Sequence, residues 1–506
     1  MKVDNQEQPG RHMNRRPRSR SHASRVRSSS TVVGPLLVVL TLAGGFSFYA
    51  QDWIAGAGIL CLWVVWALLY KRGSTPVLAV ALTYQWVQVT CGIYYYGLTG
   101  RRVEAMLASD YRSMVLMGLG CVSALLLGLV IGQKLWPSHW SRLTSDERPW
   151  LSWRFLLTAY IVTFLLSGFL QEAAWSLPVL TQGILAFNFA RLAFLFLLLR
   201  RVVSPKFRWE WFAGLVGVET AMGFTGFFAD FREPLVLAAL TLLEVFDPRS
   251  TRHWFRMTGL ATTMLVVGVL WTGIKTSFRQ DFNTEELSTR SARLERVSSL
   301  STEWLTNDME QFLTDMDKLV ERLWAIYYPA LAVARVPDYL PHENGAILWG
   351  ALRHIVTPRL LFPEKPALPS DSEMVRKYSG VLVASTDQNT TIAFGYAAES
   401  YIDFGVPLMF LPSVAYGIFM GVLYRALQSA FRDYELMVAL ITVVFWLTLY
   451  PWERSWVKTL GLTGTLVIYL GGFVFLMDRF LLRERVLSSA QKYLRPRRET
   501  ALSRRY

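Results

Sequence analysis

The segment SMVLMGLGCVSALLLGLVIGQ, residues 113–133, carries no charged side chain along its whole length. An α-helix rises about 1.5 Å per residue, so a run of about 20 apolar residues can span a hydrocarbon core about 30 Å thick. Comparable runs recur along the 506-residue chain, of which 52% is hydrophobic and only 18% is charged. This composition predicts an all-α polytopic membrane protein rather than a soluble one.

The apolar runs predict about twelve transmembrane helices. The expected spans are residues 32–50, 54–70, 76–97, 113–133, 153–171, 180–199, 210–228, 233–247, 257–275, 401–424, 434–452 and 459–478. This division leaves a basic tail (1–31), a first block of spans (32–275), a large loop (276–400), a second block of spans (401–478) and another basic tail (479–506).

Lysine and arginine are distributed unequally among the short connections. Alternate connections hold roughly fifteen of them and the others about six, the asymmetry expected when the more basic side faces the cytoplasm. Both termini are therefore predicted to be cytoplasmic, and the 276–400 loop to lie outside. The 1–31 tail is predicted to be disordered and attracted to anionic lipid, with a cleaved signal peptide as the alternative. Because tails and short loops account for the net charge of +14, no nucleic-acid partner is expected.

The large loop is predicted to form a helical lid. Residues 284–334 place apolar side chains at helical spacing among mixed charges, and a shorter helix at about 346–356 ends before Pro358. Trp324 favours a position of this lid at the membrane interface, where amphipathic aromatic rings settle.

Two charged residues in the predicted spans are functional candidates. Arg232 begins the eighth span and could hold a lipid pyrophosphate, because a guanidinium matches phosphate oxygens; snorkelling or a pair with Asp230 or Glu233 is the alternative. Glu219 lies deep in the seventh span, where a carboxylate is costly and often functional. A helix–helix pair between Glu219 and Arg191 would explain it equally well.

The loop contributes cations that interrupt apolar sequence. Arg279, Arg353, Arg359 and Lys365 could form a cationic floor for an anionic substrate, although a solvated role is the commoner one for any single residue. His354 could be a general base or a phosphate donor, or a hydrogen-bonded structural residue.

Glu399 and Asp403 lie four residues apart and therefore share one helical face at the start of the predicted tenth span. One of the two carboxylates could take a proton from a sugar hydroxyl. The alternative is a structural one, in which the negative charge stabilises a helix N-terminus.

No metal site is expected. Asp315-Met316-Asp317 matches a metal-binding Asp-x-Asp pattern, but it lies in a helical stretch without strands and is predicted to face solvent. Histidines are scattered, and no phosphate-binding glycine loop follows a strand. The cysteines, which fall within apolar segments and so predict no disulfide framework, are Cys61, Cys91 and Cys121.

Residues 352–366, LRHIVTPRLLFPEKP, resemble the Pro-Arg-x-x-x-Pro-x-Lys-Pro segment of Wzy-type oligosaccharide repeat-unit polymerases. Residues 399–405, ESYIDFG, are similar to the Glu-x-Tyr-x-Asn-Phe-Gly that enters the next span of that family, with Asp403 where Asn is common. Arg232 is similar in place to a family arginine, although Asp and Phe replace the small residues that usually precede it.

The resemblance implies a glycosyltransferase of the bacterial inner membrane that makes an O-antigen or exopolysaccharide. It would transfer an undecaprenyl-pyrophosphate-linked glycan to the non-reducing end of another lipid-linked repeat, without cofactor or metal and with inversion. Arg232, Arg353 and Arg359 would bind pyrophosphate, assisted by Lys365, and Glu399 or His354 would be the base. Arg279, Asp403 and Glu219 complete the substrate-binding candidates.

The lipid bilayer and, in the same pathway, a chain-length regulator and a flippase are the partners that this resemblance implies. Three alternatives remain open: an O-antigen ligase with the same donor, a polysaccharide flippase or exporter, and a non-catalytic component of a secretion complex.

Overall fold

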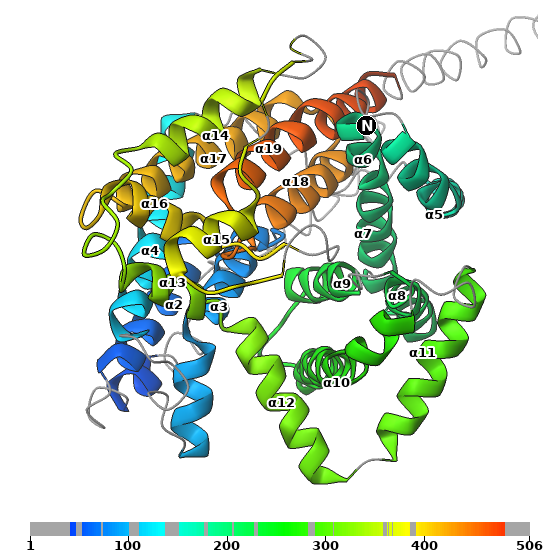
Figure 1. The fold of residues 1–506 in the computed structure, drawn as a ribbon. Coiled ribbons are helices and arrows are strands. Elements are labelled where there is room, and N and C mark those ends of the chain that lie inside the picture. Colours follow the sequence, from blue (N-terminus) through cyan, green and yellow to red (C-terminus); the bar gives the residue numbers. More distant parts are fainter. Residues whose placement is uncertain are drawn as a thin grey trace, which may run out of the picture.

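The computed structural model describes residues 41–46, 53–71, 74–100, 111–136, 151–176, 181–204, 207–226, 231–281, 289–306, 308–357, 362, 364–366, 368–384 and 391–480. Every regular element in these ranges is a helix, and they contain no strand (Figure 1). The all-α prediction is therefore confirmed.

Within the described ranges, seven helical segments are long and apolar enough to cross a membrane. They are α3 (Val77–Thr99), α4 (Tyr111–Leu135), Trp153–Leu170 of α5 (Trp153–Ser176), Thr181–Val203 formed by α6 (Thr181–Asn188) and α7 (Ala190–Val203), α10 (Thr251–Asp281), α17 (Phe410–Ala430), and Trp456–Phe480 containing α19 (Trp456–Thr465) and η4 (Leu466–Leu470). These are the helices of a membrane-embedded protein.

Four shorter helices coincide with further predicted spans: α2 (Trp53–Leu69), α8 (Trp209–Gly223), α9 (Arg232–Glu244) and α18 (Tyr434–Leu449). The first predicted span, 32–50, lies outside the described residues except for a helical piece at 41–46.

Two predicted boundaries are wrong. The span expected at 401–424 is divided between α16 (Tyr396–Phe404) and α17 (Phe410–Ala430), because Gly405 adopts a positive φ of 64° that ends the first helix. The span expected to end at 275 continues as α10 to Asp281. Charged residues after 275 resemble a loop in sequence but occupy the last turns of the helix.

Paired glycines bring α4 and α17 into close contact. Gly128 and Gly132 face Gly417 and Gly421, and a Cβ added at any of the four would collide with backbone of the facing helix. Glycines spaced by four residues on both helices allow dispersion contacts between two backbones, which matters where apolar lipid gives helices no hydrophobic reason to associate. The Gly-x-x-x-Gly spacing is visible in sequence and explains why these helices pair.

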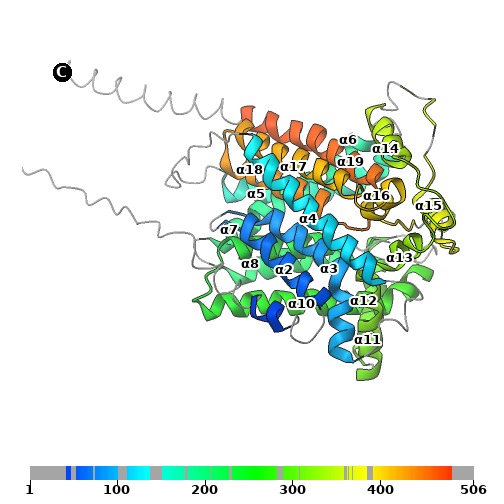
Figure 2. The same ribbon diagram turned by 90° about the vertical axis from the view of Figure 1, so that its left-hand side faces the viewer.

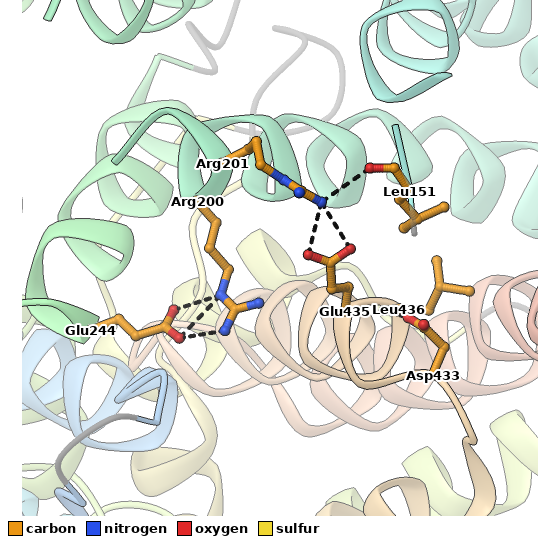
Figure 3. Close-up of polar contacts among 7 residues, drawn as sticks. All are labelled: Leu151, Arg200, Arg201, Glu244, Asp433, Glu435 and Leu436. Carbon is orange, nitrogen blue, oxygen red and sulfur yellow. Dashed lines mark hydrogen bonds and ion pairs between the residues drawn. The ribbon is translucent and has the colours of Figure 1, made fainter. Parts of the chain in front are cut away.

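Ion pairs join α7, α9 and α18 at one end of the bundle. Arg200 binds the Glu244 carboxylate through Nε and Nη2, at 3.0 and 2.7 Å, and Arg201 donates to Glu435 at 3.0 Å and to the Leu151 carbonyl at 3.0 Å (Figure 3). Glu435 lies in the first turn of α18. We call the end of the bundle that holds the Arg200–Glu244 and Arg201–Glu435 pairs the Arg200 end.

The opposite end of the bundle carries the lid layer, α11 to α16 (Figure 2). Its remaining members are α11 (Arg290–Leu305), α12 (Met309–Leu323), α13 (Tyr327–Val333), α14 (Ala346–Val356) and α15 (Asp371–Ser379). The helical character of the predicted lid is confirmed, and α14 has the predicted bounds. Trp324 is buried against α3, where its Nε1 donates to the Val89 carbonyl at 2.9 Å.

Candidate functional site

The connection between α18 and α19, residues 450–455, joins the lid layer to the bundle. The Trp452 amide donates to Gln88 Oε1 of α3 at 2.8 Å, and its carbonyl packs against Gly395 at the start of α16. Glu453 pairs with Arg322 of α12 at 2.9 Å. This short connection therefore contacts segments that lie far apart in sequence, and two predicted site residues, Arg232 and Glu399, bond to it or to the residue that follows it.

Glu399 and Asp403 project from α16 to the N-termini of two other helices. Glu399 Oε2 accepts the Trp456 amide of α19 at 2.7 Å. Asp403 accepts the amides of Ile347 and Leu348 in α14, at 3.0 and 2.8 Å. Helix N-termini present unpaired N–H groups and partial positive charge, so both carboxylates are well placed there. Both side chains therefore have a structural role as hydrogen-bond caps of neighbouring helices, in place of the charge at the N-terminus of their own helix that the structural alternative expected.

Burial dominates the electrostatics of this pair. It raises the pKa of Glu399 to about 8, partly offset by the Trp456 amide, and raises the pKa of Asp403 against its two backbone hydrogen bonds. Asp403 has no exposed surface and both of its oxygens are occupied. We therefore correct its expected role from substrate binding to the support of α14.

Arg232 begins α9 and lies between two aromatic residues. Its Nη2 donates to the Tyr450 hydroxyl at 2.5 Å and its Nη1 to Tyr84 at 3.3 Å, while its guanidinium lies 4.4 Å from the Tyr450 ring centroid. A pair with Glu233 at 3.3 Å, the alternative considered from sequence, is also present. Aromatic contacts of this kind hold the guanidinium in one orientation.

Four cations form a cluster on α10 and α12, which pack against each other. Lys275 and Arg279 are one turn apart on α10, and Lys318 and Arg322 are one turn apart on α12. Lys275 is partly buried, and Arg279, Lys318 and Arg322 all lie close enough to repel it. Lys318 pairs with Asp315 at 2.9 Å. Lys275 makes no hydrogen bond or ion pair with any residue that the structure describes. We call Lys275, Arg279, Lys318 and Arg322 the cation cluster.

Lys275, Lys318 and Arg322 were not among the residues singled out from sequence. Each belongs to a Lys-x-x-x-Arg pair, which places both charges on one face of a helix. The spacing shows a charged face on each helix, but it does not show that the charged faces of α10 and α12 pack together.

The predicted loop cations lie elsewhere. Arg353 is exposed on α14, and its side chain makes no hydrogen bond or ion pair with a described residue. Lys365 Nζ donates to the carbonyls of His354 and Thr357, the latter at 2.9 Å, and so caps the C-terminal end of α14. His354 is partly buried. Arg359 lies outside the described residues.

The single cationic floor expected from sequence is therefore wrong. α14 packs on α16 and α19, whereas α10 and α12 pack on each other and on α9 and α3. Figures 1 and 2 both place α14 on the opposite side of the lid end from α10 and α12. Arg353 and the cation cluster therefore lie on separate sides of the lid end, with residues 450–455 joined to elements on both sides.

Glu219 and the Asp-x-Asp pair both have structural partners. Glu219 is buried, pairs with Arg191 and accepts the Tyr160 hydroxyl at 2.8 Å, so its place in the substrate site is corrected to a helix–helix contact. The solvent-facing expectation for Asp315 is also wrong, because it is fully buried and bonded to Trp304 Nε1 at 2.9 Å. Asp317 accepts the Tyr95 hydroxyl at 2.6 Å.

Comparison with known proteins gives a family without a function. No curated protein and no solved structure matches the chain. The model of a domain of unknown function, DUF8712, matches residues 110–452, more than half of the 506 residues. This match runs from the start of α4 into the connection between α18 and α19, and so includes the cation cluster and α14. The chain belongs to the DUF8712 family.

Proposed function

We propose that this protein is a membrane glycosyltransferase that polymerises lipid-pyrophosphate-linked oligosaccharide repeats. The observation that carries the proposal is Lys275, which lies beside Arg279, Lys318 and Arg322 where α10 packs on α12 and makes no hydrogen bond or ion pair with a described residue. Lys318 and Arg322 already pair with Asp315 and Glu453, so Lys275 is the member that an anion would neutralise. Holding cations together costs free energy unless an anion binds them, and a pyrophosphate carries several acceptor oxygens. The cluster ends a membrane-length helix, where the head group of a lipid substrate would lie.

The reaction needs no redox partner. The oxygen of an acceptor sugar hydroxyl bonds to the anomeric carbon of the donor, and the bond from that carbon to the pyrophosphate oxygen breaks. The electron pair leaves with the lipid pyrophosphate, and the hydroxyl proton passes to a base. The cation cluster stabilises the charge that develops on the leaving group, so side-chain cations do the work that a divalent metal does elsewhere.

The base is better assigned to Glu453 than to the two residues expected from sequence. Glu399 is buried and bonded to the Trp456 amide, and His354 lies on α14, away from the cluster. Glu453 is about one-third exposed and pairs with Arg322 at the edge of the cluster. We propose that it accepts the hydroxyl proton.

Arg353, on the side of the lid end opposite the cation cluster, suits the acceptor substrate. In polymerisation the acceptor also carries a lipid pyrophosphate, at the far end of its repeat from the reacting hydroxyl. Arg353 and the cation cluster lie on opposite sides of the lid end, so the two could serve two such groups. We propose that Arg353 and Arg359 bind the acceptor pyrophosphate, and that the cation cluster and Arg232 bind the donor.

An assay with purified protein in liposomes tests this function. Lipid-pyrophosphate repeats are supplied in EDTA, and the length of the glycan and the release of lipid pyrophosphate are measured. Wild-type protein and an Arg290→Gln control, exposed on α11, are expected to produce long chains. Transfer to a lipid A core in place of a second repeat would indicate a ligase. Release of lipid pyrophosphate that requires added magnesium would contradict the assigned role of the cations.

A further inference from the structure

A cavity of about 460 Å³ lies at the Arg200 end, far from the lid layer. It opens to the surface and is lined by the end of α7, the connection from α9 to α10 and the first turns of α10. Its lining includes three basic side chains, two hydroxyls and an aromatic ring: Arg252, His253, Arg256, Ser204, Ser250 and Phe207.

The two arginines in this cavity have no polar partner among the residues that the structure describes. Neither Arg252 nor Arg256 forms a hydrogen bond or an ion pair with a residue in the described part of the chain. Arg256 lies 3.9 Å from the Phe207 ring centroid, a contact that orients the guanidinium and leaves its donors unused. His253 Nδ1 accepts the Asp247 amide at 2.8 Å, so the neutral ring carries its hydrogen on Nε2.

Two other arginines at the Arg200 end do have carboxylate partners. Arg200 and Arg201 are each bonded to a glutamate, as Figure 3 shows. Of the carboxylates close to the cavity in sequence, Glu244 is bonded to Arg200, and Asp247 accepts the Arg249 amide. The cavity thus gathers basic side chains whose counterion is not supplied by the described protein.

The surroundings place this cavity at a membrane boundary. Trp254 and Phe255, in the first turn of α10, are 50% and 82% exposed. Exposed aromatic rings at the start of a membrane-length helix are typical of the interface, where phospholipid phosphates lie. Basic pockets between helices at that level bind anionic head groups.

We propose that this cavity binds the phosphate of an anionic phospholipid head group through Arg252 and Arg256. The site is separate from the lid end and does not depend on the reaction proposed there. A free phosphate shares the recognised chemistry, and the flanking aromatic residues favour the lipid.

Native mass spectrometry of the full-length protein in detergent tests the site. Phosphatidylglycerol, phosphatidylcholine and inorganic phosphate are titrated separately. We expect phosphatidylglycerol to bind most tightly, and the Arg252→Ala/Arg256→Ala variant to bind it about tenfold more weakly. Arg249→Ala removes an exposed arginine of the same connection that does not line the cavity, and it should bind like wild type.

Two results would overturn the proposal. The first is equal binding of phosphatidylglycerol by the double alanine variant and the wild type. The second is binding of inorganic phosphate without binding of phosphatidylglycerol, which would assign the cavity to a soluble anion. Arg252→Lys/Arg256→Lys keeps the charge and should bind with intermediate affinity, so it tests the site if the alanine variant fails to fold.

Discussion

Glu399 and Asp403, one turn apart on α16, accept hydrogen bonds from the N-termini of two different helices, α19 and α14. Two carboxylates on a nine-residue helix thereby fix α14 of the lid layer relative to a membrane-length segment. Because both are almost fully buried, their contribution is to the folded structure. A substitution in either should first be tested for its effect on stability.

Asp403→Ala should lower the free energy of unfolding by about 2–3 kcal/mol, since it leaves two buried amides of α14 without an acceptor. Thermal unfolding in detergent, followed by tryptophan fluorescence, measures the loss. Glu321→Ala removes an exposed carboxylate from α12 and serves as the control. A melting temperature of Asp403→Ala equal to that of the control would contradict the capping role.

The burial of Glu399 predicts a pH dependence of stability. Its pKa is raised from 4.5 to about 8, chiefly by burial, so the folded state binds this proton more tightly than the unfolded state. The resulting stabilisation is complete below pH 4.5 and is lost as the pH rises through about 8. Melting temperatures between pH 5 and 9 should therefore fall less steeply in Glu399→Gln, whose side chain cannot ionise. An identical slope in both proteins would show that Glu399 does not titrate in this range.

Lys275→Gln should separate stability from activity. Removing a charge that three cations repel should leave the melting temperature unchanged or higher. The same change should reduce turnover of lipid-pyrophosphate substrates roughly 10–100-fold, because one positive charge beside the leaving group is lost. Arg290→Gln is the matched control on the lid layer. Full turnover by Lys275→Gln would place the pyrophosphate elsewhere.

Much of the fold could be predicted from sequence because apolar length and helix-breaking residues are local signals. The bounds of α14 follow from the apolar run after Gly345, which has a positive φ of 90°. The wrong prediction of a single span at 401–424 also comes from a local signal, because the hydrophobic run continues past Gly405. Only the backbone conformation shows that the helix stops there.

The candidate site could be predicted less well, since its partners come from distant segments. The spacing of Glu399 and Asp403 correctly placed them on one helix, but the helices that they cap begin at Trp456 and Ala346. The same holds for Lys275, whose importance depends on the facing residues of α12. Periodicity identifies a charged face on each helix and cannot show that the two faces meet.

The sidedness of the protein is predicted by the excess of basic residues in the connections at the Arg200 end. Single cysteines introduced into a variant without the three native ones can be labelled with a membrane-impermeant maleimide. Met309→Cys and Tyr339→Cys, at 71% and 77% exposed positions of the lid layer, should react in intact cells. Arg249→Cys and Ser429→Cys should react only after permeabilisation. The reverse pattern would place the cation cluster on the cytoplasmic side.

The polysaccharide of a strain that lacks this protein, resolved by size, tests the proposed function most directly. Surface glycan of this strain is expected to collapse to single repeat units, and a plasmid copy is expected to restore long chains. A plasmid copy of Lys275→Gln, expressed at the wild-type level, should restore them poorly. Long chains of unchanged length distribution in the deletion strain would contradict the assignment as a polymerase.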